Sequence, residues 1–145
     1  MDSIRISSGI KRISINDDPG RVIEFNPSDV VFAERFYELV KDFEAKQEEF
    51  KARAESIDAQ ASEMDEFGLP ANTGEKLAFV REVCTYMYEK IDYLFGAGAS
   101  QKIFGEVLSL DMIGQFFEGI TPFIRAARSE KVSKYGAAKG KRVMK

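Results

Sequence analysis

Two long segments in the middle of this 145-residue chain carry apolar residues at helical spacing, and a cluster of helix-breaking residues separates them. Gly68, Pro70, Asn72 and Gly74 cannot all lie inside one helix, so residues 61–74 are expected to form a loop. The first stripe comprises Phe32, Phe36, Leu39, Val40, Phe43, Phe50, Ala54 and Ile57, and the second comprises Leu77, Val80, Cys84, Met87, Ile91 and Leu94. This spacing predicts two long amphipathic helices joined by the loop.

The two predicted helices differ in how much apolar surface they carry. The first is expected to be capped by Asn26 or Ser28, and its second half is so rich in Glu and Lys that we expect it to protrude or to meet a partner subunit. The second begins near Asn72 or Thr73, where Asn72 and Glu75 resemble a capping box. Further Phe, Tyr and Val residues flank its stripe, which predicts the central helix of the core.

The N-terminal 25 residues alternate between apolar and polar in the manner of β-strands, and residues 4–25 are predicted to form a β-hairpin. Pro19 and Gly20 suit the central positions of a type II turn, and residues 4–7 are a candidate third strand. A lone hairpin is only marginally stable in water, so this one must pack on helices or pair with another chain. Four apolar side chains share one face of the predicted hairpin: Ile13, Ile15, Ile23 and Phe25.

The remainder of the chain is predicted to be helical until it loses its apolar pattern. A short helix is expected over residues 100–104, and Ser109 is expected to cap another that begins at Leu110. Thr121 and Pro122 resemble a cap followed by a first-turn proline, and so predict a separate last helix towards Tyr135. The expected fold is therefore mainly α with a small N-terminal β-hairpin (α+β): one helical domain over residues 1–135 and a disordered basic tail over residues 136–145.

Composition excludes several classes of function. The chain has no His and a single Cys, which removes the usual general base and any multi-thiolate metal site. No apolar run reaches the roughly 18 residues of a membrane span. We therefore expect a cytoplasmic protein that is not an enzyme, binds no cofactor or metal, and does not enter a membrane.

Charge is distributed unevenly along the chain. Residues 125–145 hold eight basic residues and one acidic residue, a net charge of +7, which leaves −10 for residues 1–124. An acidic body with a basic end indicates self-association or a partner that meets each surface separately, although a solvated basic tail gives the same pattern. The acidic body would repel a phosphate backbone, so nucleic-acid binding is not expected.

Three motifs that could carry chemistry have simpler structural interpretations. Gly96-Ala97-Gly98 follows a predicted helix rather than a strand and lacks the third glycine of a dinucleotide motif, so we interpret it as a helix stop. Cys84 lies on the apolar face of the second long helix, where a thiol is inert. Asp17-Asp18 precedes Pro-Gly and is typical of a turn.

Residues 104–124 are denser in apolar side chains than one amphipathic helix requires. Two interpretations remain open: a pair of helices that closes the core, or a groove for a partner helix lined by Phe116, Ile120 and Phe123.

The same residues, FGEVLSLDMIGQFFEGITPFI (104–124), resemble the C-terminal region of the small tail assembly chaperones of long-tailed bacteriophages and prophages of Gram-positive bacteria. The N-terminal hairpin, the helical body and the basic C-terminal end are similar to that family in layout. The resemblance implies a non-enzymatic protein of the host cytoplasm that binds the helical tape measure protein, keeps it soluble while the tail tube assembles, and is absent from the mature virion. It also implies self-association and a longer frameshifted form that contacts the major tail protein.

On this interpretation, two sets of residues are candidate contact sites. The predicted site for tape-measure helices comprises Phe116, Phe117, Ile120, Phe123 and Ile124, and the predicted self-association site comprises Ile13, Ile15, Ile23 and Phe25. Two other functions remain as alternatives: a structural head–tail connector or tail-completion subunit, and a small nucleic-acid-binding regulator acting through the basic tail.

Overall fold

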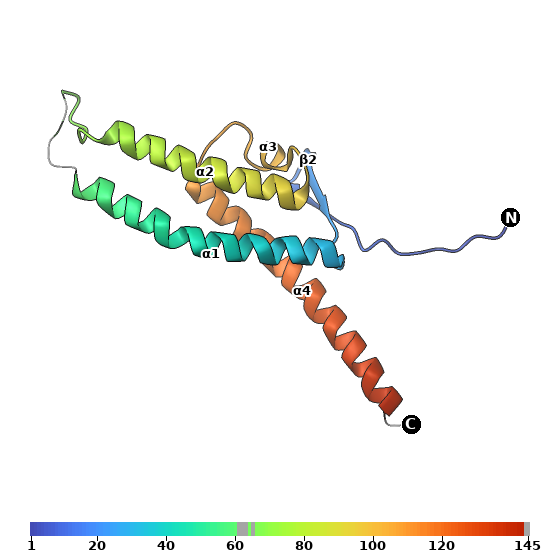
Figure 1. The fold of residues 1–145 in the computed structure, drawn as a ribbon. Helices are drawn as coiled ribbons and strands as arrows, with labels where there is room; N and C mark the ends of the chain where they lie inside the picture. The colour runs from blue at the N-terminus through green and yellow to red at the C-terminus, as the bar shows by residue number, and fades with distance from the viewer. Residues whose placement is uncertain (61–63, 65, 144–145) are drawn as a thin grey trace.

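The fold is built on two long helices that lie side by side and antiparallel, as the computed structural model in Figure 1 shows. The structure describes the backbone of residues 1–60, 64 and 66–143, and the side chains of these residues as far as 126. Within this part, the chain order is β1 (Lys11–Ile15), β2 (Asp18–Phe25), α1 (Val30–Ala59), α2 (Thr73–Phe95), α3 (Ala99–Phe104) and α4 (Leu110–Val143). The expected α+β class, mainly helical with an N-terminal hairpin, is confirmed.

The hairpin is antiparallel, and its turn lies three residues earlier than the sequence predicted. Ile15 pairs with Asp18, so the loop consists of Asn16 and Asp17. Both have positive φ angles, 54° and 58°, as a type I′ turn requires at its two central positions. Pro19 and Gly20 instead lie within β2, at an irregularity in the pairing where proline's missing N–H costs no ladder hydrogen bond. Residues 4–7 form no strand.

The hairpin packs on its own helices. Arg21 joins it to the C-terminal end of α3, because its Nε donates to the Lys102 carbonyl at 2.8 Å and its Nη2 donates to the Ile103 carbonyl. Ile23 and Phe25 are buried beneath the hairpin, and the Phe25 ring lies 5.4 Å from those of Phe32 on α1 and Phe95 on α2. The same contacts extend through Phe116 to α3 and α4, so one aromatic cluster connects every element of the core.

The predicted central helix is central in the structure. Cys84 and Ile91 on α2 have no exposed surface, and Val83, Met87 and Leu94 are also buried. Asn72 does precede α2, but it makes no side-chain cap there: its Nδ2 donates to the Ile57 carbonyl near the end of α1. The N-cap of α1 is Asp29, whose carboxylate accepts from the Val31 N–H at 2.9 Å, whereas Asn26 closes the preceding turn through contacts with Ser28.

The second half of α1 extends beyond α4 together with the first half of α2 (Figure 1). Phe50 contacts Phe79 and Tyr86, with ring centroids 6.0 and 5.8 Å apart. Ion pairs connect the two helices at Lys90–Asp42, Lys76–Asp58 and Arg53–Glu82. The thinly apolar half of α1 therefore packs on α2 of the same chain.

The predicted helix break at Thr121 and Pro122 is absent: α4 runs continuously from Leu110 to Val143 with Pro122 inside it. Buried Phe116, Ile120 and Ile124 recur every four residues across this point, so burial of one continuous face outweighs the cost of an internal proline. Ser109 caps the start of the helix as predicted, accepting from the Met112 N–H at 3.3 Å. Residues 136–143, predicted to be disordered, continue α4 as helix, and 144–145 lie outside the described residues.

Candidate functional site

An open apolar groove of about 930 Å³ lies between α1 and α4, with α2 beneath it. Val83 and Met87 of α2 form its floor. One wall comes from the N-terminal part of α1 and the residue before it: Pro27, Phe32, Ala33, Phe36, Tyr37, Leu39, Val40, Phe43 and Glu44. The other comes from the first half of α4: Leu110, Ile113, Gly114, Phe117, Thr121, Ile124 and Arg125.

The rim of this groove exposes large apolar side chains to solvent. Tyr37 is 62% exposed, Leu110 is 44% exposed and Val40 is 36% exposed. Deeper in the groove, Phe36 and Phe117 are half-buried and pack against the core. Such a surface costs free energy in water, which an apolar ligand covering it would recover.

Gly114 contributes to the hollow. It lies on the groove wall, and a Cβ atom built on it would meet no atom within 4 Å. Glycine weakens a helix interior by roughly 1 kcal/mol relative to alanine. The absence of a side chain here leaves room in the groove.

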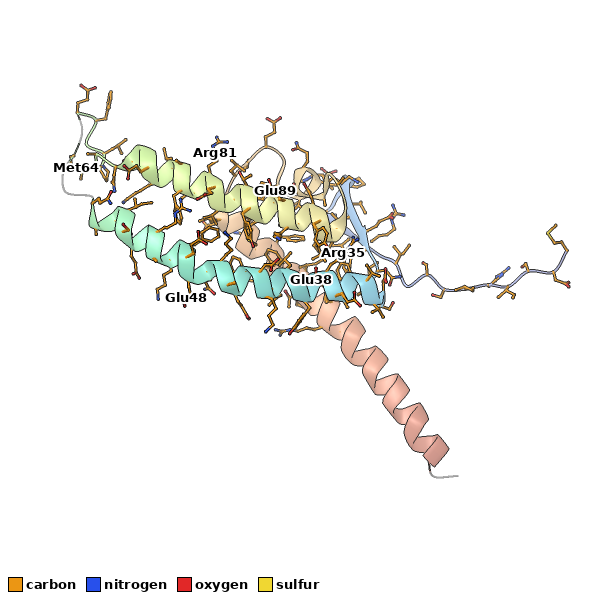
Figure 2. The ribbon with its side chains drawn as sticks, in the orientation of Figure 1. Arg35, Glu38, Glu48, Met64, Arg81 and Glu89 are labelled. Atoms are coloured by element: carbon orange, nitrogen blue, oxygen red, sulfur yellow. The ribbon has the colours of Figure 1, made fainter. Side chains whose placement is uncertain are left out.

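Charged groups are sparse in the groove. Glu44 of α1 and Arg125 of α4 are its charged lining residues. Figure 2 shows charged side chains along α1 and α2, including Glu38 and Glu48 on α1 and Arg81 and Glu89 on α2. An apolar groove between helices is the kind of surface that accepts the apolar face of an amphipathic helix.

The structure separates the residues predicted to bind a partner helix. Phe117 and Ile124 line the groove. Phe116 and Ile120 belong to the core, with exposed fractions of 9% and 3%. Phe123 is 41% exposed and lies outside the groove, under the Lys11 ammonium at 5.6 Å from the ring centroid. The predicted row of Phe116, Ile120 and Phe123 is therefore not a groove wall: the three residues share one helix face, and this face packs on the core at Phe116 and Ile120 and meets Lys11 at Phe123.

The residues predicted for self-association lie mostly inside the chain. Ile13 pairs with Ile23, Lys11 pairs with Phe25, and Ile23 and Phe25 are buried. Ile13 and Ile15 are half-buried and face a smaller cleft of about 240 Å³ between the hairpin, α3 and α4, which Phe116 and Ile120 also line. The hairpin therefore packs these side chains against helices of its own chain.

Sequence reasoning missed the α1 side of the groove. The sequence did contain a signal for it. Contact with one neighbouring helix needs a single row of apolar residues, but this segment has adjacent apolar pairs, Phe36 with Tyr37 and Leu39 with Val40. In the structure, Leu39 is buried, while its neighbour Val40 lies at the rim of the groove.

The other chemical candidates have structural roles. Among the residues that the structure describes, no group of three or more His, Cys, Asp or Glu could hold a metal ion. Cys84 is fully buried, and burial raises the pKa of its thiol. Gly96 ends α2 with φ 111°, and Gly98 precedes α3 with φ 84°, as expected of a helix stop. None of the described helices is long and apolar enough to cross a membrane.

Comparison with known proteins gives one family match. A model described as a family of unknown function (DUF6673) matches residues 19–145, which leaves the N-terminal segment and β1 outside the match. No curated protein and no solved structure matches the chain.

Proposed function

The chain belongs to the DUF6673 family, and for this member of a family of unknown function we propose the role of a tail assembly chaperone of a long-tailed bacteriophage or prophage. In this proposal the groove between α1 and α4 binds amphipathic helices of the tape measure protein and keeps that protein soluble until the tail tube surrounds it. The observation that carries the proposal is the groove itself, an open apolar surface between helices.

The dimensions of the groove suit a helix. Residues 30–44 of α1, which form one wall, span about 21 Å at 1.5 Å per residue, enough to contact about four turns of a ligand helix. A ligand with apolar residues at i, i+3, i+4 and i+7 would place one face against Phe36, Phe117 and Met87. Its polar face would remain in solvent.

Residues 104–124 support the choice of client, because they resemble the tail chaperones and supply most of α4's groove wall. The proposal includes a non-enzymatic role in the host cytoplasm, self-association, absence from the finished virion, and a longer frameshifted form that contacts the major tail protein.

The test is co-expression with the tape measure protein encoded nearby, followed by size-exclusion chromatography of the soluble fraction. The chain offers a matched pair of variants. Gly114→Leu fills the groove, whereas Gly119→Leu places the same side chain on the same helix, facing the smaller cleft. Neither added Cβ meets an atom within 4 Å.

We expect the wild type and Gly119→Leu to solubilise the tape measure protein and co-elute with it, and Gly114→Leu to leave it insoluble. A second pair of variants lies on α1. We expect Val40→Glu, inside the groove, to leave the tape measure protein insoluble, and Val31→Glu, outside the groove, to solubilise it. If wild-type protein elutes alone and mass spectrometry finds it in purified virions, the chaperone proposal fails and a structural tail subunit takes its place.

A further inference from the structure

The first ten residues form an extended arm that leaves the body of the protein at the hairpin end (Figure 1). This arm is unusually apolar for an exposed segment. Ile4 and Ile6 are 87% and 85% exposed, and Ile10 is 53% exposed. Ile4 and Ile6 alternate with Arg5 and Ser7, so an extended arm presents both isoleucines on one side.

The root of the arm is fixed at the mouth of the apolar groove. Asn26 Nδ2 donates to the Ser8 carbonyl at 2.5 Å, and Pro27, the next residue, lines the groove. Gly9 has φ +74°, and a Cβ built there would lie 2.6 Å from Ser28 Oγ, so the close approach requires glycine. On the opposite side, Lys11 lies over Phe123 of α4, two residues from the groove residue Arg125.

The arm is long enough to follow the groove. Residues 1–7 can span about 23 Å as an extended chain, and the α1 wall from residue 30 to residue 44 covers about 21 Å. A segment tethered at one end of a site has an effective concentration in the millimolar range, so apolar contacts with a dissociation constant below that range favour intramolecular docking.

We propose that residues 1–7 fold back into the groove of their own chain, with Ile4 and Ile6 against the apolar side chains of α1 and α4. The arm is then an internal occupant that covers the groove in the free protein. Its consequence for the client, which must displace the arm, rests on the proposed function; the docking itself does not.

Nuclear magnetic resonance of the full-length protein alone tests the docking. With isotope-labelled isoleucine methyl groups, we expect nuclear Overhauser effects from Ile4 and Ile6 to the rings of Tyr37 and Phe117, unchanged on dilution. Random-coil methyl shifts without these effects would overturn the proposal. So would effects that appear only between differently labelled copies in a mixed sample, since the arm would then bind a second copy.

A double variant provides an independent measurement. Ile4→Ser with Ile6→Ser changes only exposed side chains, so the fold should be unaffected. If the arm fills the groove nine-tenths of the time, removing its apolar side chains strengthens binding of the dye anilinonaphthalene sulfonate about tenfold. Val107→Ser, an exposed apolar residue outside the groove, is the control and should leave the affinity unchanged. Equal affinity in wild type and double variant would contradict the proposal. Because no client is present in either experiment, these results stand apart from the co-expression test.

Discussion

Phe116 shows how one side chain can hold several elements together. Its ring lies 5.5 Å from Phe95 of α2, 5.9 Å from Phe104 of α3 and 5.6 Å from Phe117 of its own helix. Removing it would leave a cavity where three elements meet, since its neighbours are fixed by their own contacts.

We therefore expect Phe116→Ala to lower the free energy of unfolding by about 3–5 kcal/mol. Phe123→Ala, at an exposed position of the same helix, should lower it by less than about 1 kcal/mol, mainly through the lost contact with Lys11. Urea unfolding followed by circular dichroism gives both values. Similar losses for the two variants would mean that Phe116 is not a core residue.

Three neighbouring side chains on α2 make stability depend on alkaline pH. Burial raises the pKa of the Cys84 thiol and of the Tyr88 phenol, and a hydrogen bond with Asp42 raises the pKa of Lys90. In each case the folded state holds the proton more tightly than the unfolded state, so stability is complete below the unfolded pKa and is lost as pH rises above it.

The ordinary pKa values of these groups are about 8.5 for a thiol, about 10 for a phenol and about 10.4 for a lysine ammonium. We expect the free energy of unfolding to be level up to about pH 8.5 and to fall steadily above about pH 9. Urea titrations across this range measure the effect. Tyr88→Phe, which also loses the hydrogen bond to the Val107 carbonyl, should show a smaller decline above pH 10. A stability that rises with pH in this range would contradict the assignment.

At the scale of elements, apolar spacing predicted the helices better than local signals predicted their ends. The helices predicted from the two apolar stripes, α1 and α2, both form, because burial of many side chains on one face outweighs the helix propensities of individual residues. Local signals competed with one another: Asn26, Ser28 and Asp29 can all cap a helix, and Asn16-Asp17 and Pro19-Gly20 can both make a turn. The pairing of Ile15 with Asp18 decides the second case, and it follows an irregularity in the strand register that apolar alternation does not reveal.

The position of the hairpin turn can be tested with two glycine substitutions. Asp17 has φ 58°, so Asp17→Gly should stabilise the protein by about 0.4–1 kcal/mol by relieving a left-handed conformation. Gly20→Ala should change stability by less than about 0.5 kcal/mol, because Gly20 lacks a positive φ and the added Cβ meets only the exposed Asp18 carboxylate. A type II turn at Pro19-Gly20 would give the reverse order in thermal unfolding.

The proline inside α4 gives a second test at this scale. An internal proline removes the hydrogen bond to the carbonyl four residues earlier, and here the Thr121 hydroxyl donates to the Phe117 carbonyl at 2.6 Å in the same turn. Pro122→Ala should therefore raise the free energy of unfolding by up to about 3 kcal/mol and increase the helical signal. A loss of stability would instead indicate a helix that begins at Pro122, because proline favours the first turn.

At the scale of the whole molecule, the groove arises from an arrangement that the sequence pattern does not contain. Residues 104–124 indicated surplus apolar surface, and Phe117 and Ile124 do line the groove. The α1 wall could not be assigned, because helical spacing shows which residues share a face and leaves open which helix covers it. α4 crosses behind α1 (Figure 1). The surplus apolar side chains of α4 therefore separate into two groups: those on the side of Phe116 pack in the core, and those on the side of Phe117 line the groove.

The charge asymmetry of the chain leads to a last prediction, about self-association. The distal part of α4 extends away from the body (Figure 1), and residues 125–145 carry a net charge of +7 against −10 for residues 1–124. Attraction between the basic end of one copy and the acidic body of another favours the proposed self-association. We therefore expect oligomers to dissociate between about 0.1 M and about 1 M salt, as the screening length falls from about 10 Å to about 3 Å.

Sedimentation velocity measures this dissociation. The control is a variant carrying Lys139→Gln, Lys141→Gln and Arg142→Gln, which should form smaller oligomers than the wild type even at low salt. Oligomers that persist in high salt would show that apolar surfaces hold the copies together, because burial of apolar area is not weakened by salt screening.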